Sequence, residues 1–173
     1  MKITLLEKYD FEQLFAIMQE AFPPEEYRPK ERQFAILDDA NYSVHIAKEN
    51  GKILCFLAVW NLGEFDFVEH FAVDASLRNQ GVGSKFLKEY LKTTVRPTVL
   101  EVENVDDDIS KRRIKFYQRC GLELTDICYN QPNFQNSNKI IPLRIMVFDK
   151  TNSLDRHIIA PIIFKKVYKR PIQ

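Results

Sequence analysis

Cysteine, glycine and net charge are all scarce in this chain of 173 residues, and each scarcity excludes a class of protein. The three cysteines, Cys55, Cys120 and Cys128, are too few for a disulfide framework and indicate a reducing compartment. A formal net charge of +1 argues against a protein that binds nucleic acid or a membrane surface through bulk charge. Because the chain has only 5 glycines, two of them close together call for an explanation.

Long apolar runs are also missing. The longest, ILCFLAVW at residues 53–60, is far shorter than the about 20 residues that a membrane-spanning helix needs. The first ten residues, MKITLLEKYD, lack the apolar core of a secretory signal peptide. The length suits one domain with a sizeable core. We therefore expect a cytoplasmic protein with no nucleic-acid partner, no membrane partner and no metal site.

Alternating and helical apolar patterns predict a mixed α/β fold. Apolar residues recur at helical spacing after Asp10, and Pro29 is suited to open a second, short helix. The dipeptide Asn50-Gly51 predicts a tight hairpin. The aspartates at 106–108 favour the start of a late helix that Gly121 would end. Strands are expected at residues 3–6, at 42–60 as two strands joined by the hairpin, and at 64–73, 98–103, 122–129 and 139–149.

The order of these elements predicts a mixed, mostly antiparallel central sheet with a central βαβ unit. The strand–helix–strand unit implies a right-handed crossover between parallel strands, and hairpins flank it. We expect residues 1–149 to form the main domain. Residues 150–173 would be an extension, packed on the same domain or at a dimer contact. Within it, HIIAPIIF at 157–164 fits an extra strand, a homodimer contact or a packed flap.

The stretch RNQGVG at 78–83 places two glycines between a strand and a helix. Gly81 and Gly83 carry no side chains that block the backbone, so nearby N–H groups can point outward at the positive end of the helix dipole. Such a joint can hold an anionic group such as a phosphate, and a tight turn without a ligand is the alternative. A P-loop spacing is missing, and the Rossmann fingerprint would need a third glycine where this chain has Phe86. Both nucleotide motifs are therefore excluded.

A longer stretch, VDASLRNQGVG, resembles the acetyl-CoA-binding motif of the GNAT superfamily of N-acetyltransferases. In that family a strand ending in valine precedes the pattern Arg/Gln-x-x-Gly-x-Gly/Ala. The matching positions here are Val73, Arg78, Gly81 and Gly83. The family's late helix typically ends in an aromatic-Tyr pair before a glycine, which KFYQRCGL at 115–122 reproduces. The resemblance covers roughly residues 1–149 and extends to the order of strands and helices.

The resemblance implies acetyl-CoA as the cofactor. In this family the diphosphate lies on backbone amides of the glycine loop, and the pantetheine arm pairs with the preceding strand, which commonly splays at a bulge. The implied cofactor-binding residues are Phe71, Val73, Arg78, Asn79, Gln80, Gly81, Val82, Gly83 and Ser84. The family often places an asparagine seven residues before the helix tyrosine. Ser110 stands there in this chain and has a shorter reach; it could equally be a helix-start serine.

Acetyl transfer to an amine requires a neutral nitrogen and a proton for the departing thiolate. Tyr117 matches the family position whose hydroxyl protonates the sulfur. A core tyrosine on the apolar face of its helix is the alternative. The resemblance therefore implies Tyr117 as the general acid.

Glu69 is the candidate general base. It is expected on the strand face that also carries Phe71 and Val73, where partial desolvation would raise its pKa toward a useful range. Contact with a substrate ammonium and a plain salt bridge are the alternatives, and several of these enzymes need no dedicated base. His70 is expected on the opposite face, and Glu103 is a weaker candidate.

In this family the early helices and the late strands line the acceptor side. FPPEEYRP at 22–29 could receive a cationic amine or be a solvated helix end, and CYNQPNF at 128–134 is expected as a polar loop facing the acceptor. The residues implied as acceptor contacts are Glu25, Tyr27, Tyr129 and Gln131. We expect direct transfer in a ternary complex to a primary amine of a small molecule or peptide. The alternative is a regulatory module that binds coenzyme A or an acyl-CoA without turnover.

Overall fold

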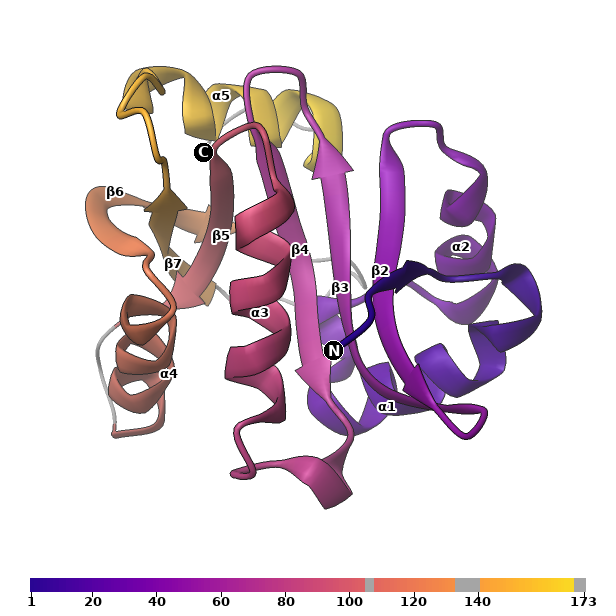
Figure 1. Cartoon of the computed structure of the whole chain (residues 1–173). Coiled ribbons are helices and arrows are strands. Elements are labelled where there is room, and N and C mark those ends of the chain that lie inside the picture. Colours follow the sequence, from indigo (N-terminus) through magenta and orange to yellow (C-terminus); the bar gives the residue numbers. More distant parts are fainter. Residues whose placement is uncertain (105–107, 133–140, 170–173) are drawn as a thin grey trace.

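One central sheet of seven strands organises the molecule (Figure 1). The computed structural model describes residues 1–104, 108–132 and 141–169. The strands are β1 Thr4–Leu5, β2 Tyr42–Glu49, β3 Lys52–Asn61, β4 Asp66–Val73, β5 Thr98–Glu103, β6 Glu123–Gln131 and β7 Ile141–Phe148. They lie in the order β1-β2-β3-β4-β5-β7-β6. Among the described residues only β4 and β5 pair in parallel, which confirms the predicted mixed, mostly antiparallel sheet.

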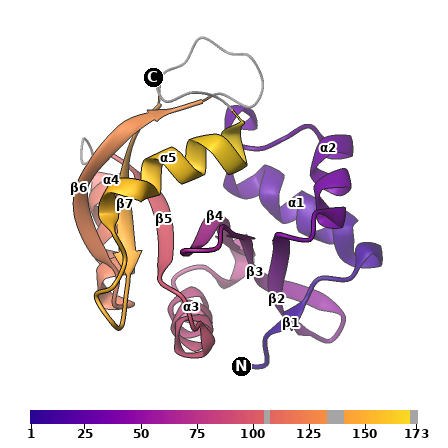
Figure 2. The same ribbon diagram turned by 90° about the horizontal axis from the view of Figure 1, so that it is seen from above.

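Helices cover both faces of this sheet (Figure 2). The helices are α1 Phe11–Ala21, α2 Lys30–Ala35, α3 Val82–Thr93, α4 Asp108–Arg119 and α5 Ile159–Ile163, and α5 continues into a π-helix at Phe164–Tyr168. α3 and α4 pack on one face, whereas α1, α2 and α5 lie on the other. In the described ranges, none of these helices is long and apolar enough to cross a membrane.

The turn residues take the backbone conformations that the sequence predicts. Asn50 and Gly51 have φ values of 49° and 79°, the left-handed pair that a two-residue hairpin needs. Gly121, at φ 104°, follows the end of α4. α3 connects β4 to the parallel strand β5, so the predicted central βαβ unit is confirmed.

A β-bulge in β4 decides which side chains face the two layers of helices. The register with β3 passes from Val68 directly to His70, so Glu69 is an extra residue. Glu69 and His70 therefore both face the α1 side, where they contact Arg28 and Phe22. Phe71 and Val73 pack on the α3–α4 side. The prediction that Glu69 shares a face with these two residues and lies opposite His70 is wrong, because an inserted residue shifts the alternation.

The C-terminal extension forms a helix against the sheet. Ile159, Ile163 and Val167 recur every four residues, a helical spacing, and all are at most 5% exposed. They belong to the same apolar cluster as α1. The extra-strand interpretation of 157–164 is therefore wrong, and the segment covers the chain's own core.

Four predicted features fall partly outside the described residues: the aspartates 106 and 107, the strand start at 139–140, residues 133 and 134 of the predicted loop, and residues 170–173 of the extension. The last strand itself is described from Ile141. β6 continues to Gln131, which pairs with Ile141. The loop predicted from residue 128 is therefore wrong over its first residues, because β7 extends the ladder.

Candidate active site

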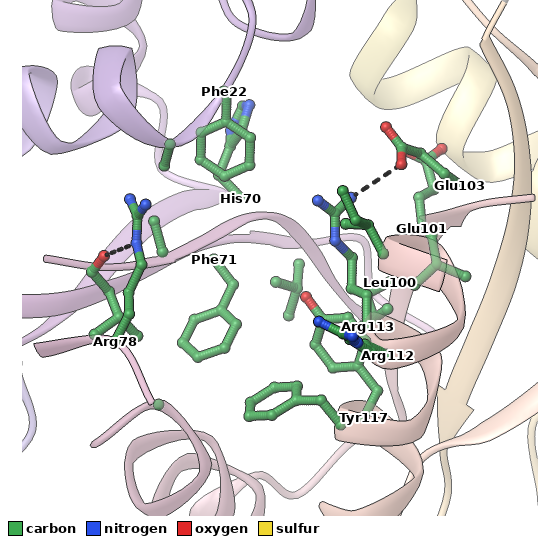
Figure 3. A pocket seen from close by; sticks show the side chains of 18 of the residues that line it. Phe22, His70, Phe71, Arg78, Leu100, Glu101, Glu103, Arg112, Arg113 and Tyr117 are labelled. Carbon is green, nitrogen blue, oxygen red and sulfur yellow. Dashed lines mark hydrogen bonds and ion pairs between the residues drawn. The ribbon is translucent and has the colours of Figure 1, made fainter. Parts of the chain in front are cut away.

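A cleft of about 860 Å³ opens where β4 and β5 separate (Figure 3). These strands pair only through residues 66–68 and 98–100. Beyond residue 68 no described residue of β5 pairs with β4, and the bulge at Glu69 lies at this point. One edge of β4 therefore lies unpaired with β5 inside the cleft, where it can form main-chain hydrogen bonds with an extended ligand.

The glycine loop forms one end of the cleft. Gly81 has φ +78°, and a Cβ on Gly83 would lie 2.9 Å from Val73 Cγ2, so both positions favour glycine. The first main-chain bond of α3 runs from the Lys85 N–H to the Gly81 carbonyl, at 3.0 Å. In the described part of the chain, the N–H groups of residues 82–84 donate to no protein acceptor. They form an anion-binding nest at the positive end of a 12-residue helix.

Charge divides the cleft into two ends. The arginines that line it come from the glycine loop and α4: Arg78, Arg112, Arg113 and Arg119. The carboxylates that line it are Glu26, Glu69, Glu101 and Glu103, of which Glu69 pairs with Arg28 and Glu103 pairs with Arg113. Opposite charges attract more strongly where water is partly excluded. The first end therefore suits an anionic ligand, and the second suits a cation.

Tyr117 reaches from α4 into the cleft toward Phe71 (Figure 3). Its ring packs against Phe116 and Phe71, with centroids 5.2 and 6.4 Å away. Burial raises the pKa of Tyr117 to about 12, so its hydroxyl keeps its proton at neutral pH. No group in the described ranges bonds that hydroxyl. Among the described residues, the phenol is therefore a proton donor without an acceptor.

Glu69 is held in a buried ion pair. Its carboxylate accepts two hydrogen bonds from the Arg28 guanidinium, at 2.7 and 2.8 Å. The two side chains are 5% and 11% exposed. Burial by itself would raise the pKa of Glu69, but the charge of Arg28 outweighs it and holds that pKa well below the usual range. The predicted raised pKa is therefore wrong, and the salt-bridge alternative describes the side chain.

This ion pair ties the segment after α1 to the bulge of β4. His70 contributes to the same connection, because its Nε2 lies 2.8 Å from the Glu26 carbonyl oxygen. We expect Arg28→Met or Glu69→Leu alone to lower the free energy of unfolding by about 3–5 kcal/mol, since each leaves a buried charge without its counter-ion. The double variant should recover most of that loss. Urea denaturation of all four proteins measures the coupling, and single variants costing under about 1 kcal/mol would contradict it.

Glu101, on β5, is the carboxylate that sequence reasoning missed. It accepts hydrogen bonds from Tyr129 and from Tyr168, the latter at 2.9 and 2.7 Å to its two oxygens. No Lys or Arg in the described ranges forms an ion pair with it. Burial raises the pKa of Glu101 to about 7, although the two phenol hydrogen bonds lower it. The signal in the sequence was an acidic residue between the apolar residues Leu100 and Val102 of the strand VLEVE.

The structure brings most of the expected cofactor residues together. Those that line the cleft are Phe71, Val73, Arg78, Asn79, Gly81, Val82, Gly83 and Ser84. Gln80 and Ser110 are not among its lining residues. Gln80 turns back to donate to the Ser76 carbonyl at 2.9 Å, and Ser110 is only 2% exposed. The expected contact of Gln80 is through its main chain, so it stays a prediction, as does the expected contact of the Ser110 side chain.

The expected acceptor residues are only partly brought together. Gln131 lines the cleft. Tyr27 instead packs edge-on against Phe15 in the core, with ring centroids 5.8 Å apart, and Glu26 lines the cleft in place of Glu25. Tyr129 does not line the cleft, but its hydroxyl donates a hydrogen bond to Glu101, which does. The prediction therefore missed by one position in the turn after α1, where Glu26 and not Glu25 lines the cleft.

Comparisons with known proteins identify the family of the chain. Residues 11–122 match the family model described as "Acetyltransferase (GNAT) family". A Bacillus subtilis (strain 168) protein named "Putative acetyltransferase YjbC" is 37% identical over 106 residues, 59% of this chain and 52% of that protein. The match thus spans about half the length of that relative.

Two solved structures are also similar. The first, described as "Putative acetyltransferase from GNAT family from Bacteroides thetaiotaomicron", is 31% identical, with a TM-score of 0.86 over 99% of this chain and all of that one. The second is an aminoglycoside 6'-N-acetyltransferase complexed with coenzyme A. It is 14% identical, with a TM-score of 0.63 over 85% of this chain and 96% of that one, and shows the fold alone. The family match covers more than half of the chain, and the chain therefore belongs to the acetyltransferase (GNAT) family.

Proposed function

We propose that the protein is an acetyl-CoA-dependent N-acetyltransferase that moves the acetyl group directly to a cationic primary amine. The observation that carries this proposal is the content of one cleft. It combines an anion-binding loop, a protonated phenol and a half-buried carboxylate that no Lys or Arg of the described residues pairs with. Each of the three has a separate part in amide formation from an ammonium.

The residues at the glycine loop fit coenzyme A. Main-chain N–H groups of residues 82–84 would hold its diphosphate, and the four arginines of that end would add attraction for phosphate. The exposed edge of β4 would pair with the amide groups of the pantetheine arm. The coenzyme supplies an acetyl group activated as a thioester. The bound coenzyme A of the aminoglycoside enzyme, which shares the fold, is in accord with this assignment.

Two side chains move the protons. Glu101 takes one proton from the ammonium, which frees the nitrogen lone pair for attack on the thioester carbonyl. The nitrogen would lose its second proton to water as the amide forms, and the Tyr117 hydroxyl would give its proton to the departing sulfur. Tyr117 then regains a proton through water, so Glu101 passes one proton to solvent in each cycle. Ionised Glu101 and protonated Tyr117 coexist between about pH 7 and about pH 12.

The acceptor is a small molecule or a peptide that carries an ammonium group. A cation would remove the cost of a buried carboxylate that two phenols only partly compensate. Phe22, Ile141 and Leu143 surround this end, so an apolar segment beside the ammonium would also be buried. The aminoglycoside after which the second similar structure is named is likewise an amine.

Release of coenzyme A across a panel of amines tests the proposal. The panel contains polyamines, amino acids, aminoglycosides and short peptides, with mass spectrometry of the products. We expect thiol release only with acceptors that carry a primary ammonium, matched by one acetyl group on each product molecule. Tight coenzyme A binding with no release on any amine would instead establish the regulatory-module alternative.

A further inference from the structure

The C-terminal helix carries a phenol that contacts the core of the cleft. Tyr168 is the last residue of the π-helix and is 9% exposed. Its hydroxyl donates to both carboxylate oxygens of Glu101, which lies 67 positions earlier in the chain. Tyr129 of β6 donates to one of the same oxygens. Glu101 is thus held by two segments from outside the region that matches the family model, residues 11–122.

The two phenols are fixed by their surroundings. Phe164 packs edge-on against both rings, with centroids 5.2 Å from Tyr129 and 5.5 Å from Tyr168. Lys166 donates to the Leu62 carbonyl at 2.7 Å and ties the helix to the β3–β4 turn. A π-turn widens the helix by one residue and is frequent at functional sites. Burial raises the pKa of both phenols well above the usual range, so both remain hydrogen-bond donors.

We infer that the C-terminal helix is part of the active site, where Tyr168, with Tyr129, positions the carboxylate of Glu101 by hydrogen bonds. This inference rests on the proposed function for the role of Glu101 as proton acceptor. It extends the active site beyond residues 11–122, which match the family model, to β6 and the C-terminal helix.

The contacts explain how the phenols would act. A carboxylate accepts several hydrogen bonds, whereas a protonated carboxyl group must use one oxygen as a donor. Two phenol donors therefore favour the ionised form and offset part of the effect of burial. The other titratable groups near Glu101 are Glu69 and His70 of β4, and Glu69 is itself paired with Arg28. Removal of one phenol leaves these groups in place.

The test compares Tyr168→Phe and Tyr129→Phe with wild type and with Tyr90→Phe. Tyr90 is a buried tyrosine of α3 on the opposite face of the sheet and does not line the cleft, so it is a matched control. We expect Tyr168→Phe to move the titration of Glu101, and the lower limb of kcat/KM against pH, upward by about one unit. Tyr129→Phe should move both in the same direction, and Tyr90→Phe should move neither. The Kd for coenzyme A should not change.

Carbon NMR of the Glu101 carboxyl group in the full chain separates this inference from the proposed function. A shifted titration in Tyr168→Phe, with no acetyl transfer even in wild type, would support the positioning role and overturn the enzymatic one. An unchanged titration in both Tyr168→Phe and Tyr129→Phe would overturn the inference, whatever the activity. Melting curves of each variant confirm that it is folded at the temperature used.

Discussion

Replacing Tyr117 with phenylalanine is expected to lower kcat about 10²- to 10⁴-fold, the usual contribution of a general acid. The change removes only the hydroxyl, because the ring contacts with Phe71 and Phe116 remain. No described protein group depends on that hydroxyl, so stability should change little. Steady-state kinetics with a productive amine gives kcat, and calorimetry gives the Kd for acetyl-CoA, which should stay nearly constant.

Tyr90→Phe is the control for this variant as well, because it deletes a buried hydroxyl outside the cleft. Its kcat should lie within about twofold of wild type. If Tyr117→Phe retains the wild-type rate, Tyr117 has no part in proton transfer. A large loss of cofactor affinity with kcat unchanged would assign the residue to binding alone.

Replacing Glu101 with glutamine is expected to lower kcat/KM about 100-fold or more above pH 7, by removing both the proton acceptor and the negative charge that attracts the amine. In wild type the ionised fraction of Glu101 rises with pH through its pKa of about 7. The rate should therefore rise through that range and then level off. In Glu101→Gln this rise of kcat/KM with pH should be absent.

Glu103→Gln provides the comparison on the same strand. Glu103 is partly exposed and pairs with Arg113 at 3.5 Å, so its loss should change kcat/KM only a few-fold. Equal losses in both variants would show that the strand, and not Glu101 itself, matters. A Glu101→Gln enzyme with the wild-type pH profile would remove Glu101 from the mechanism.

Stability gives a second measure of Glu101 that needs no activity. Its pKa rises from 4.5 in the unfolded chain to about 7 in the folded one, so the folded state binds more protons between these values. The contribution of Glu101 to stability therefore falls as pH rises through this window. The melting temperature of Glu101→Gln relative to wild type should increase between about pH 5 and about pH 8, and a constant difference would contradict the raised pKa.

Local signals in the sequence predicted much of the fold. The hairpin at Asn50-Gly51 and the helix end at Gly121 depend on residues that tolerate positive φ, and both are confirmed. The anion-binding joint depends on Gly81 and Gly83 within one turn of α3, so a short motif contains its geometry. Such features depend on neighbours in the chain, and pattern reasoning reaches them.

The carboxylate end of the cleft depends on contacts between distant segments, and sequence reasoning largely missed it. The bulge at Glu69 is a matter of register with β3, which alternation along one strand does not reveal. The pairing of Glu69 with Arg28 requires knowledge of where the segment after α1 lies. Glu101, Tyr129 and Tyr168 come from β5, β6 and the C-terminal helix, and meet only in the folded chain.

Calorimetric titration of the full chain with acetyl-CoA tests the central claim most directly. We expect one binding site per chain, with an affinity that weakens as salt rises because the phosphates would contact arginines and helix amides. Glu101→Gln, at the other end of the cleft, should bind the cofactor as wild type does. No detectable heat at millimolar acetyl-CoA would contradict the assignment of the glycine loop, and with it the proposed enzymatic function.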